Sequence, residues 1–246
     1  MYFAGPCSYI NKSQTREIID TASELKKIAT DNEIDVRFRV KIYCGGTNPV
    51  KWHAGIEDDG LPTLEEINKF LMPAGTEVQV PGHINKCVNL SYVWIGARNC
   101  QNYGLLEYIK RFPGDILIKR SPGMTIDETI GLYDIMNDIK ERKVYIVERG
   151  INTFDRTQES RWSPDVKGAI RISEERPDIF ERLIIDLSHS TGKKEYIPKL
   201  YSAFQAIGIK HYMVEVMKNP DSSKTDKEQI LNIEEFKSMI GGWLIK

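Results

Sequence analysis

Residues 92–148 decide the fold, because three short apolar runs there are separated by two longer amphipathic stretches: YVWIGA (92–97), ILIK (116–119) and VYIVE (144–148). These runs are rich in β-branched and aromatic residues, which favours strands. The stretches between them, about 102–112 and 126–140, have the apolar spacing of helices. A strand, a helix and another strand in repeated order predict parallel βαβ units.

The same alternation continues toward both ends of the chain. The other predicted strands are Tyr2–Gly5, Val36–Tyr43, Glu77–Val80, Leu183–Leu187 and Tyr212–Val216. The other predicted helices are about 13–31, 63–72, 83–88, 164–176, 194–208 and 227–240. Eight strand–helix units predict an α/β fold, a single (β/α)8 TIM barrel over residues 1–246, rather than an open doubly wound sheet. Because the first strand starts at residue 2 and the last helix ends near 240, we expect no appended regulatory domain.

Composition excludes several classes of protein. The net charge is −1, and no basic stripe interleaved with aromatic residues is present, so we expect no nucleic-acid partner. No apolar run approaches the length of a membrane span, and no signal peptide is recognisable, so we expect a cytoplasmic protein without a membrane partner. The cysteines follow no secreted spacing and are expected to be reduced; they are Cys7, Cys44, Cys87 and Cys100.

In barrels of this kind, the chemistry lies at the carboxyl ends of the strands. Four potential metal ligands occur at or near such ends: Cys7, His189, Glu215 and Asp226. A thiolate, an imidazole and two carboxylates suit a divalent transition ion, and Mn²⁺, Fe²⁺, Co²⁺ or Zn²⁺ would each fit. Taken singly, the residues have structural interpretations, such as a buried thiol for Cys7 or a helix-start carboxylate for Asp226.

Three cations form a second group. Arg98, Lys119 and Arg149 follow the fourth, fifth and sixth predicted strands, which would be neighbours around the barrel. Each could belong to a structural ion pair. Their shared position at strand ends instead predicts a binding site for an anion, because guanidinium groups match the paired oxygens of phosphate and carboxylate.

A resemblance to a known family rests on six strings in order along nearly the whole chain. They are GPCS (5–8), IGARNCQNY (95–103), LIKR (117–120), ERGI followed by TF (148–154), SHSTGK (188–193) and MVEV (213–216). The chain resembles the type I 3-deoxy-D-arabino-heptulosonate 7-phosphate (DAHP) synthases, especially their β subgroup, which are related to 3-deoxy-manno-octulosonate 8-phosphate synthase. The resemblance implies a cytoplasmic transferase that condenses phosphoenolpyruvate with erythrose 4-phosphate at the start of the shikimate pathway, leading to aromatic amino acids. It also implies a homo-oligomer.

Carried over by position, the resemblance implies roles for individual residues. The metal ligands would be Cys7, His189, Glu215 and Asp226. Phosphoenolpyruvate would be held by Lys41, Arg98, Lys119 and Arg149, with backbone N–H groups near Ala97. A metal acting as Lewis acid would bind the aldehyde oxygen, and the catalytic residues would be Lys119 or Glu77 for proton movement, together with the ligand His189.

The sequence departs from the family where the second substrate would bind. The KPRT-type string after the second strand is absent, and residues 47–53 read TNPVKWH. Asn48, Lys51 and His53 are the candidates to replace it. Asn152 and Met217 also stand where the family has Arg and His.

Two alternatives to DAHP synthesis stay open. One is a sister synthase that joins phosphoenolpyruvate to a different, even unphosphorylated, aldehyde. The other is a non-catalytic barrel that binds a metal and an anion; the complete set of four candidate ligands argues against it.

Overall fold

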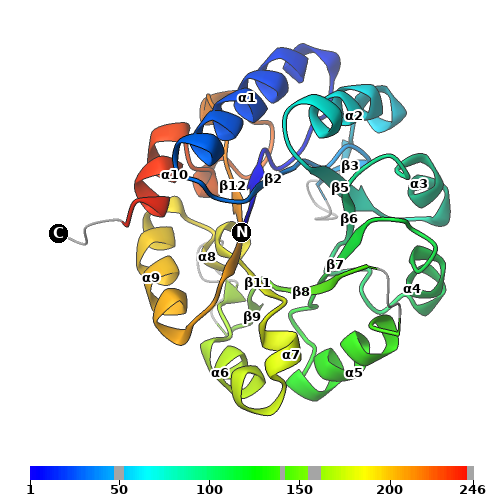
Figure 1. Cartoon of the computed structure of the whole chain (residues 1–246), viewed down its shortest axis with the longest axis vertical. Helices are drawn as coiled ribbons and strands as arrows, with labels where there is room; N and C mark the ends of the chain where they lie inside the picture. The colour runs from blue at the N-terminus through cyan, green and yellow to red at the C-terminus, as the bar shows by residue number, and fades with distance from the viewer. Residues whose placement is uncertain (47–52, 139–141, 155–161, 243–246) are drawn as a thin grey trace.

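The computed structural model describes residues 1–46, 53–138, 142–154 and 162–242. Eight parallel strands close into a barrel in the order β1-β12-β11-β8-β7-β6-β5-β2. These strands are β1 Tyr2–Gly5, β2 Val36–Arg39, β5 Ala74–Val78, β6 Tyr92–Ile95, β7 Asp115–Lys119, β8 Val144–Glu148, β11 Leu183–Asp186 and β12 His211–Glu215. Figure 1 shows the ring of strands surrounded by helices, so the predicted (β/α)8 barrel is confirmed.

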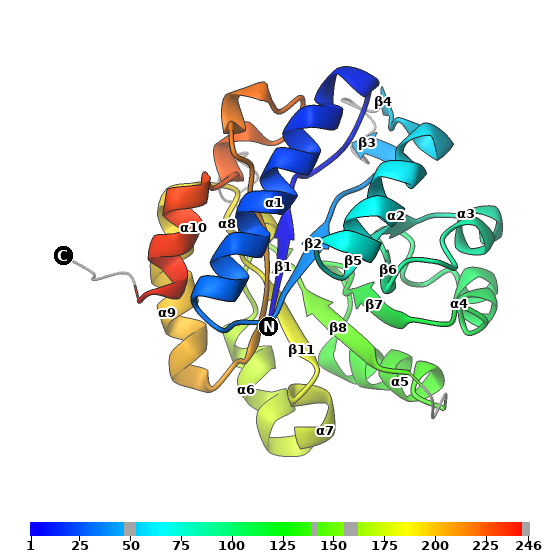
Figure 2. The ribbon, with the colours of Figure 1, turned by 45° about the horizontal axis from the view of Figure 1, so that its top comes forward.

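The helices form the outer layer of the barrel (Figures 1 and 2). They are α1 Thr15–Asp31, α2 Leu61–Phe70, α3 Pro81–Lys86, α4 Tyr103–Ile109, α5 Ile126–Met136, α6 Val166–Glu175, α7 Pro177–Phe180, α8 Leu187–Thr191, α9 Ile197–Ile207 and α10 Ile233–Ile240. Capping boxes begin α5, at Thr125 with Glu128, and α10, at Asn232 with Glu235. Among the described residues, no helix is both long and apolar enough to cross a membrane.

Side-chain alternation along the strands divides the core in two. Outward-facing residues such as Val93 and Ile95 pack under the helices, in the large outer cluster. Inward-facing residues fill the barrel: Phe3, Tyr92, Trp94, Leu117, Tyr145, Val147, Ile184 and Met213. In several of these strands, the next inward-facing residue, two positions further along, is charged. These charged residues form a polar layer at the carboxyl ends of the strands, above the apolar residues that fill the barrel.

Two predicted strands differ from the observed ones by three or more residues at one end. The third barrel strand is Ala74–Val78, three residues earlier than predicted at its start. Gly75 is needed there because a Cβ atom would lie 2.3 Å from the Tyr92 carbonyl, so a small residue replaces the expected β-former. Regular β2 ends at Arg39, and the chain continues through single contacts such as Lys41 N–H to Cys7 O at 3.3 Å.

Two short hairpins and several short helices were not predicted. The hairpins pair β3 Cys44–Gly46 with β4 His53–Ala54, and β9 Ile151–Asn152 with β10 Trp162–Ser163. Three 3-10 helices instead lie at the starts of helices predicted at 13–31, 194–208 and 227–240; they are Lys12–Gln14, Lys194–Tyr196 and Lys227–Gln229, and the last is separated from α10. The short helices outside the predicted ones are Glu57–Gly60, α7, α8 and Pro220–Ser222. All of these lie in connections between barrel units, where elements of two to five residues carry too little periodicity to be recognised.

Candidate active site

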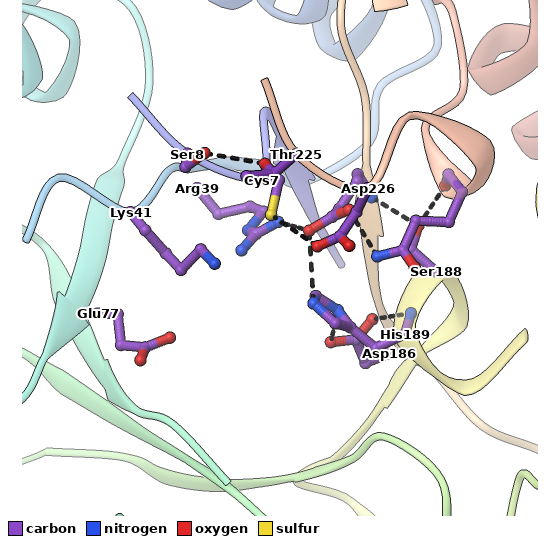
Figure 3. Close-up of polar contacts among 12 residues, drawn as sticks. Cys7, Ser8, Arg39, Lys41, Glu77, Asp186, Ser188, His189, Thr225 and Asp226 are labelled. Atoms are coloured by element: carbon purple, nitrogen blue, oxygen red, sulfur yellow. Dashed lines mark hydrogen bonds and ion pairs between the residues drawn. The ribbon is translucent and has the colours of Figure 1, made fainter. Parts of the chain in front are cut away.

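The polar layer follows directly from strand alternation. Leu117 faces into the barrel, and so does Lys119 two residues later; the same step leads from Met213 to Glu215. The carboxyl ends of all eight strands meet at one mouth, so these side chains converge. Figure 3 shows polar side chains that meet at this mouth, among them Arg39, Lys41 and Glu77.

The four predicted metal ligands come together. Cys7 follows β1, His189 lies in α8, Glu215 ends β12, and Asp226 precedes the 3-10 helix Lys227–Gln229. One ligand atom from each lies within 4.8 Å of every other (Figure 3). Their thiol, imidazole and carboxylate groups form a donor set suited to a divalent transition ion. The residues therefore fit a metal, and the geometry does not select among Mn²⁺, Fe²⁺, Co²⁺ and Zn²⁺.

Burial affects the protonation of two of these candidate ligands, Cys7 and Glu215. Burial and the neighbouring Glu215 carboxylate raise the pKa of the Cys7 thiol, which donates a hydrogen bond to Asp226 Oδ2 at 3.6 Å. Burial opposes ionisation of Glu215 as well, but His189 and Arg39 lower the pKa of that carboxyl to about 2. Glu215 is thus a carboxylate, whereas Cys7 needs an additional positive charge nearby to become a thiolate.

Glu215 is held from several sides. Arg39 Nη1 donates to Oε1 at 2.9 Å, and Gln229 Nε2 donates to Oε2 at 2.8 Å. The Glu215 backbone N–H donates to Ser188 Oγ at 2.9 Å. Arg39 and Glu215 are both fully buried, and Arg39 Nε and Nη2 have no hydrogen-bond partner among the described residues. Such buried donors require an acceptor, so Arg39 is suited to receive an anionic ligand.

Asp186 lies between the metal-ligand group and the cations. Its Oδ2 accepts a hydrogen bond from Lys119 Nζ at 2.7 Å and lies 2.8 Å from His189 Nδ1. Its Oδ1 accepts the His189 backbone N–H at 3.0 Å, as the N-cap of α8. Burial lowers the pKa of Lys119, and the Asp186 carboxylate opposes that shift.

A cavity of about 400 Å³ opens at the same mouth. Five cations line it: Arg39, Lys41, Arg98, Lys119 and Arg149. Lys41 is buried, yet Cys7, Glu77 and Glu215 raise its pKa, so it carries a positive charge. His189 belongs both to the cavity wall and to the metal-ligand group. The predicted anion-binding residues, including Ala97, therefore share one pocket beside the four candidate ligands.

Glu77 is the acidic member of the cavity wall. Its Oε2 accepts a hydrogen bond from Trp94 Nε1 at 3.1 Å, and its side chain lies across the mouth from His189 (Figure 3). Gly96 provides the space for it, since a Cβ atom there would lie 2.6 Å from Glu77 Oε1. The carboxylate is thus positioned to exchange a proton with a molecule in the cavity.

The predicted aldehyde-binding residues are only partly described. Asn48 and Lys51 lie outside the described residues. His53 lies on the β3–β4 hairpin, where its ring covers Gly45, and the Gly45 carbonyl accepts a hydrogen bond from Lys41 Nζ at 3.2 Å. Asn152 pairs with Trp162 across the β9–β10 hairpin. Met217 is buried.

The sequence reasoning missed Arg39, Asp186 and Gln229. A signal existed for Arg39, because Arg37 and Arg39 alternate with apolar residues in β2 and must both point into the barrel. Asp186 ends an apolar strand in the same way as Glu215. Gln229 had no comparable signal, since its role depends on how residues 217–231 fold back over the barrel mouth.

The closed barrel, its carboxyl-end cavity lined by cations and the adjoining cluster of potential metal ligands define a class: a (β/α)8-barrel enzyme that acts on an anionic substrate. Comparison with known proteins specifies the family. Residues 1–242 match the model of the DAHP synthetase I family, and the chain belongs to that family. It is a DAHP synthase-type transferase, as the resemblance implied.

Individual relatives carry the names of two different enzymes. A phospho-2-dehydro-3-deoxyheptonate aldolase of Thermotoga maritima is 28% identical over 244 residues, covering 96% of this chain and 67% of the relative. A 2-dehydro-3-deoxyphosphooctonate aldolase of Rhodopseudomonas palustris is 23% identical over 251 residues, covering 96% and 84%. The crystal structure of the Thermotoga maritima enzyme superposes with a TM-score of 0.83 at 25% identity, covering 98% of this chain and 67% of that one. A truncated form gives a TM-score of 0.78 at 26% identity, covering 98% and 84%.

Proposed function

We propose that this protein catalyses the metal-dependent condensation of phosphoenolpyruvate with erythrose 4-phosphate, giving DAHP and inorganic phosphate. This is the first reaction of the shikimate pathway. The observation that carries the proposal is the position of His189, which belongs both to the four-residue metal-ligand group and to the wall of the cationic cavity. An electrophile held by the metal and an anion held by the cations would therefore meet at one mouth.

The cations are the groups that would bind phosphoenolpyruvate. Its phosphate and carboxylate together need several positive donors, and Arg39, Lys41, Arg98, Lys119 and Arg149 surround one cavity. The donors of buried Arg39 that lack a partner would gain one from the ligand. Backbone N–H groups near Ala97 would add to the same site. Binding in this pocket would fix carbon 3 in one orientation.

Cys7, His189, Glu215 and Asp226 would hold a divalent ion. Bound there, it would supply Lewis-acid polarisation of the aldehyde oxygen. Arg39 and Gln229 hold the Glu215 carboxylate in place, and Asp186 anchors the His189 backbone. Such outer contacts orient the ligands.

The reaction moves protons as well as carbon. Carbon 3 of phosphoenolpyruvate attacks the aldehyde carbon, whose oxygen takes up a proton, while water adds at carbon 2 and loses one. In the hemiketal phosphate, the bond between carbon 2 and the phosphate oxygen then breaks; the carbon 2 hydroxyl gives up its proton to become the ketone, and the phosphate leaves with that proton. Glu77 can accept a proton and Lys119 can donate one; they line the same cavity, and the lowered pKa of Lys119 eases donation.

A sister synthase that uses a different aldehyde is the second candidate function. The observation in its favour is the sequence after β2, where TNPVKWH replaces the KPRT-type string. That difference concerns the second substrate alone, since the residues proposed for the metal and phosphoenolpyruvate are all present.

One experiment tests both candidates. Phosphate release from phosphoenolpyruvate is followed with erythrose 4-phosphate and with a panel of phosphorylated and unphosphorylated aldoses, after loading with Mn²⁺, Fe²⁺, Co²⁺ or Zn²⁺. Fastest turnover with erythrose 4-phosphate supports DAHP synthesis, and fastest turnover with another aldose supports a sister synthase. No turnover with any aldose, in a protein that still binds phosphoenolpyruvate, would favour the non-catalytic barrel.

A further inference from the structure

Arg120 forms a buried ion cluster behind the cavity wall. Its Nη1 donates to Glu148 Oε2 at 2.8 Å and to Asp165 Oδ2 at 2.7 Å. Its Nε and Nη2 both donate to the Met124 carbonyl, at 3.2 and 2.6 Å. All three nitrogens of the guanidinium group are therefore engaged. The Arg120 side chain is only 6% exposed, so this geometry is fixed by contacts on every side.

The cluster lies directly behind two of the cavity's cations. Arg120 follows Lys119, and Glu148 precedes Arg149, so alternation turns Arg120 and Glu148 outward where Lys119 and Arg149 turn inward. Figure 1 shows α5 and α6 on the outside of the ring on either side of β8. The Arg120–Glu148 pair thus holds the ends of neighbouring strands β7 and β8 together under those helices.

Glu148 also fixes the backbone on the far side of Arg149. Its Oε1 accepts the Gly150 N–H at 2.6 Å, and Gly150 has a φ of +99°, which favours glycine. A Cβ atom at Gly150 would lie 2.8 Å from Trp162 Cβ. The chain therefore turns sharply just after Arg149, with Glu148 as the anchor of the turn.

Asp165 fixes the segment that carries Trp162, whose ring contacts Arg149. The Arg149 guanidinium lies over the Trp162 ring, 4.7 Å from its centre, in a cation–π contact. Trp162 begins β10, and Asp165 follows three residues later as the N-cap of α6, accepting the Gly168 N–H at 2.8 Å. By binding Asp165, Arg120 ties the segment that carries Trp162 to the strand end that carries Arg149.

We propose that Arg120 is a positioning residue for Arg149. It fixes the backbone of Arg149 through Glu148 and the aromatic ring beneath it through Asp165. This inference rests on the proposed function, in which Arg149 binds an anionic group of phosphoenolpyruvate. A lysine at this position would keep the positive charge of Arg120. It lacks the planar guanidinium group whose several N–H donors reach two carboxylates and a carbonyl together.

A double-mutant cycle on phosphoenolpyruvate affinity tests the proposal. Dissociation constants are measured by titration calorimetry for the wild type, Arg120→Lys, Arg149→Met and the double variant. We expect Arg149→Met to weaken binding by roughly ten- to a hundredfold, as the loss of a charge-assisted contact implies. With Arg149 present, Arg120→Lys should weaken phosphoenolpyruvate binding by about tenfold. This is a smaller loss than the roughly hundredfold effect that a displacement of about 1 Å can cause. In the Arg149→Met background, Arg120→Lys should have no further effect.

Kinetics and a matched control separate positioning from a general structural role. Arg120→Lys should raise KM for phosphoenolpyruvate and leave KM for the aldehyde and kcat near their wild-type values. Arg171→Lys is the control, because Arg171 also bridges two carboxylates, Asp127 and Glu175, but on the surface. Asp165→Asn is the second variant if Arg120→Lys does not fold, since the amide oxygen can still cap α6.

The outcomes are distinct. An unchanged affinity in Arg120→Lys, or an equal loss with and without Arg149, would overturn the positioning role while leaving the proposed function in place. An unchanged affinity in Arg149→Met would instead show that Arg149 is not a phosphoenolpyruvate ligand, which overturns that part of the proposed function and this inference with it.

Discussion

The Nδ1 atom of His189 lies 2.8 Å from Oδ2 of Asp186, and the same carboxylate oxygen accepts a hydrogen bond from Lys119 Nζ at 2.7 Å. Asp186 is completely buried, and despite that burial His189 and Lys119 hold its pKa well below the ordinary value. A permanent negative charge thus lies between the proposed metal site and the proposed phosphoenolpyruvate site.

Replacing this charge should weaken both sites. In Asp186→Asn, the amide oxygen can still cap α8, but the charge beside His189 and Lys119 is lost. We expect the affinity for Mn²⁺ or Zn²⁺ to fall by roughly 10–100-fold, as for other outer partners of metal ligands. Calorimetric titration with each ion measures this directly. An unaltered metal affinity would restrict Asp186 to holding Lys119 and capping α8.

Removal of an inner ligand should have a larger effect. His189→Ala should abolish both retention of a stoichiometric divalent ion and turnover, since His189 supplies the one imidazole in the four-residue group. Metal content after gel filtration, measured by elemental analysis, is the readout. His211→Gln is the control, because His211 begins β12 at the opposite end of the barrel. An active His189→Ala variant holding one ion per chain would show that the site is misassigned.

Gly96→Ala should separate catalysis from stability. The added methyl group would lie 2.6 Å from Glu77 Oε1, so the Glu77 side chain must move, and its free end can do so at little cost. We expect kcat to fall by about tenfold or more, because a positioned proton-transfer group contributes roughly 10²–10⁴-fold. The midpoint of thermal unfolding should change little. The control is Gly131→Ala in α5, which should leave kcat unchanged because a Cβ atom there meets no atom within 4 Å. If Gly96→Ala keeps the wild-type kcat, Glu77 has no role in the mechanism.

His211 predicts a loss of stability on acidification. Burial and the N-terminal ammonium group lower its pKa from the ordinary 6.5. Its Nε2 donates to the Glu181 carbonyl at 3.0 Å, while Nδ1 is buried and has no partner in the part of the chain that the structure describes. The unfolded chain therefore binds a proton more readily than the folded one, and stability falls as the pH drops below about 6.5. Urea unfolding at pH 7.5, 6.5 and 5.5 should show a smaller decline for His211→Gln than for the wild type. Equal declines would assign the effect to other groups.

The barrel was predictable from the sequence because its signal is repeated. Each strand, such as Ile116–Lys119 or Val144–Glu148, is a short β-rich run, and eight of them alternate with helical stretches. The position of the polar layer followed as well, since strand ends in a closed barrel must meet. Four residues separated by up to 219 positions, from Cys7 to Asp226, were correctly placed together.

The contacts that support the site were harder to predict. The resemblance implied roles only for residues proposed to contact ligands, whereas Asp186, Arg120 and Gln229 contact other side chains. Their partners depend on which way each side chain points after the chain turns, as at Gly150, which has a φ of +99° and donates its N–H to Glu148. A single sequence shows no pattern for such a turn. The hairpins β3–β4 and β9–β10 were missed because strands of two or three residues carry too little periodicity to be recognised.

The last prediction concerns the aldehyde. The residues proposed for phosphoenolpyruvate surround the cavity, but the KPRT-type string that would hold a terminal phosphate is absent, and Asn152 replaces an Arg. His53, the described candidate among its replacements, packs on Gly45 in the β3–β4 hairpin. Each lost charge-assisted hydrogen bond to a phosphate is worth roughly 1.5–3 kcal/mol.

Two such losses correspond to about two to four decades in affinity, at roughly 1.4 kcal/mol per decade. We therefore expect phosphoenolpyruvate to bind normally while erythrose 4-phosphate shows a raised KM, unless the residues 47–53 supply new cations. Steady-state kinetics with erythrose 4-phosphate, longer aldose phosphates and unphosphorylated aldoses measures this directly. Lys51→Ala and His53→Ala, each compared with the wild type, would show which replacement carries the phosphate. Altered specificity would be contradicted by a KM for erythrose 4-phosphate of about 1–10 μM, together with no better aldehyde in the panel. Such a KM lies at the low end of the range for ordinary enzymes.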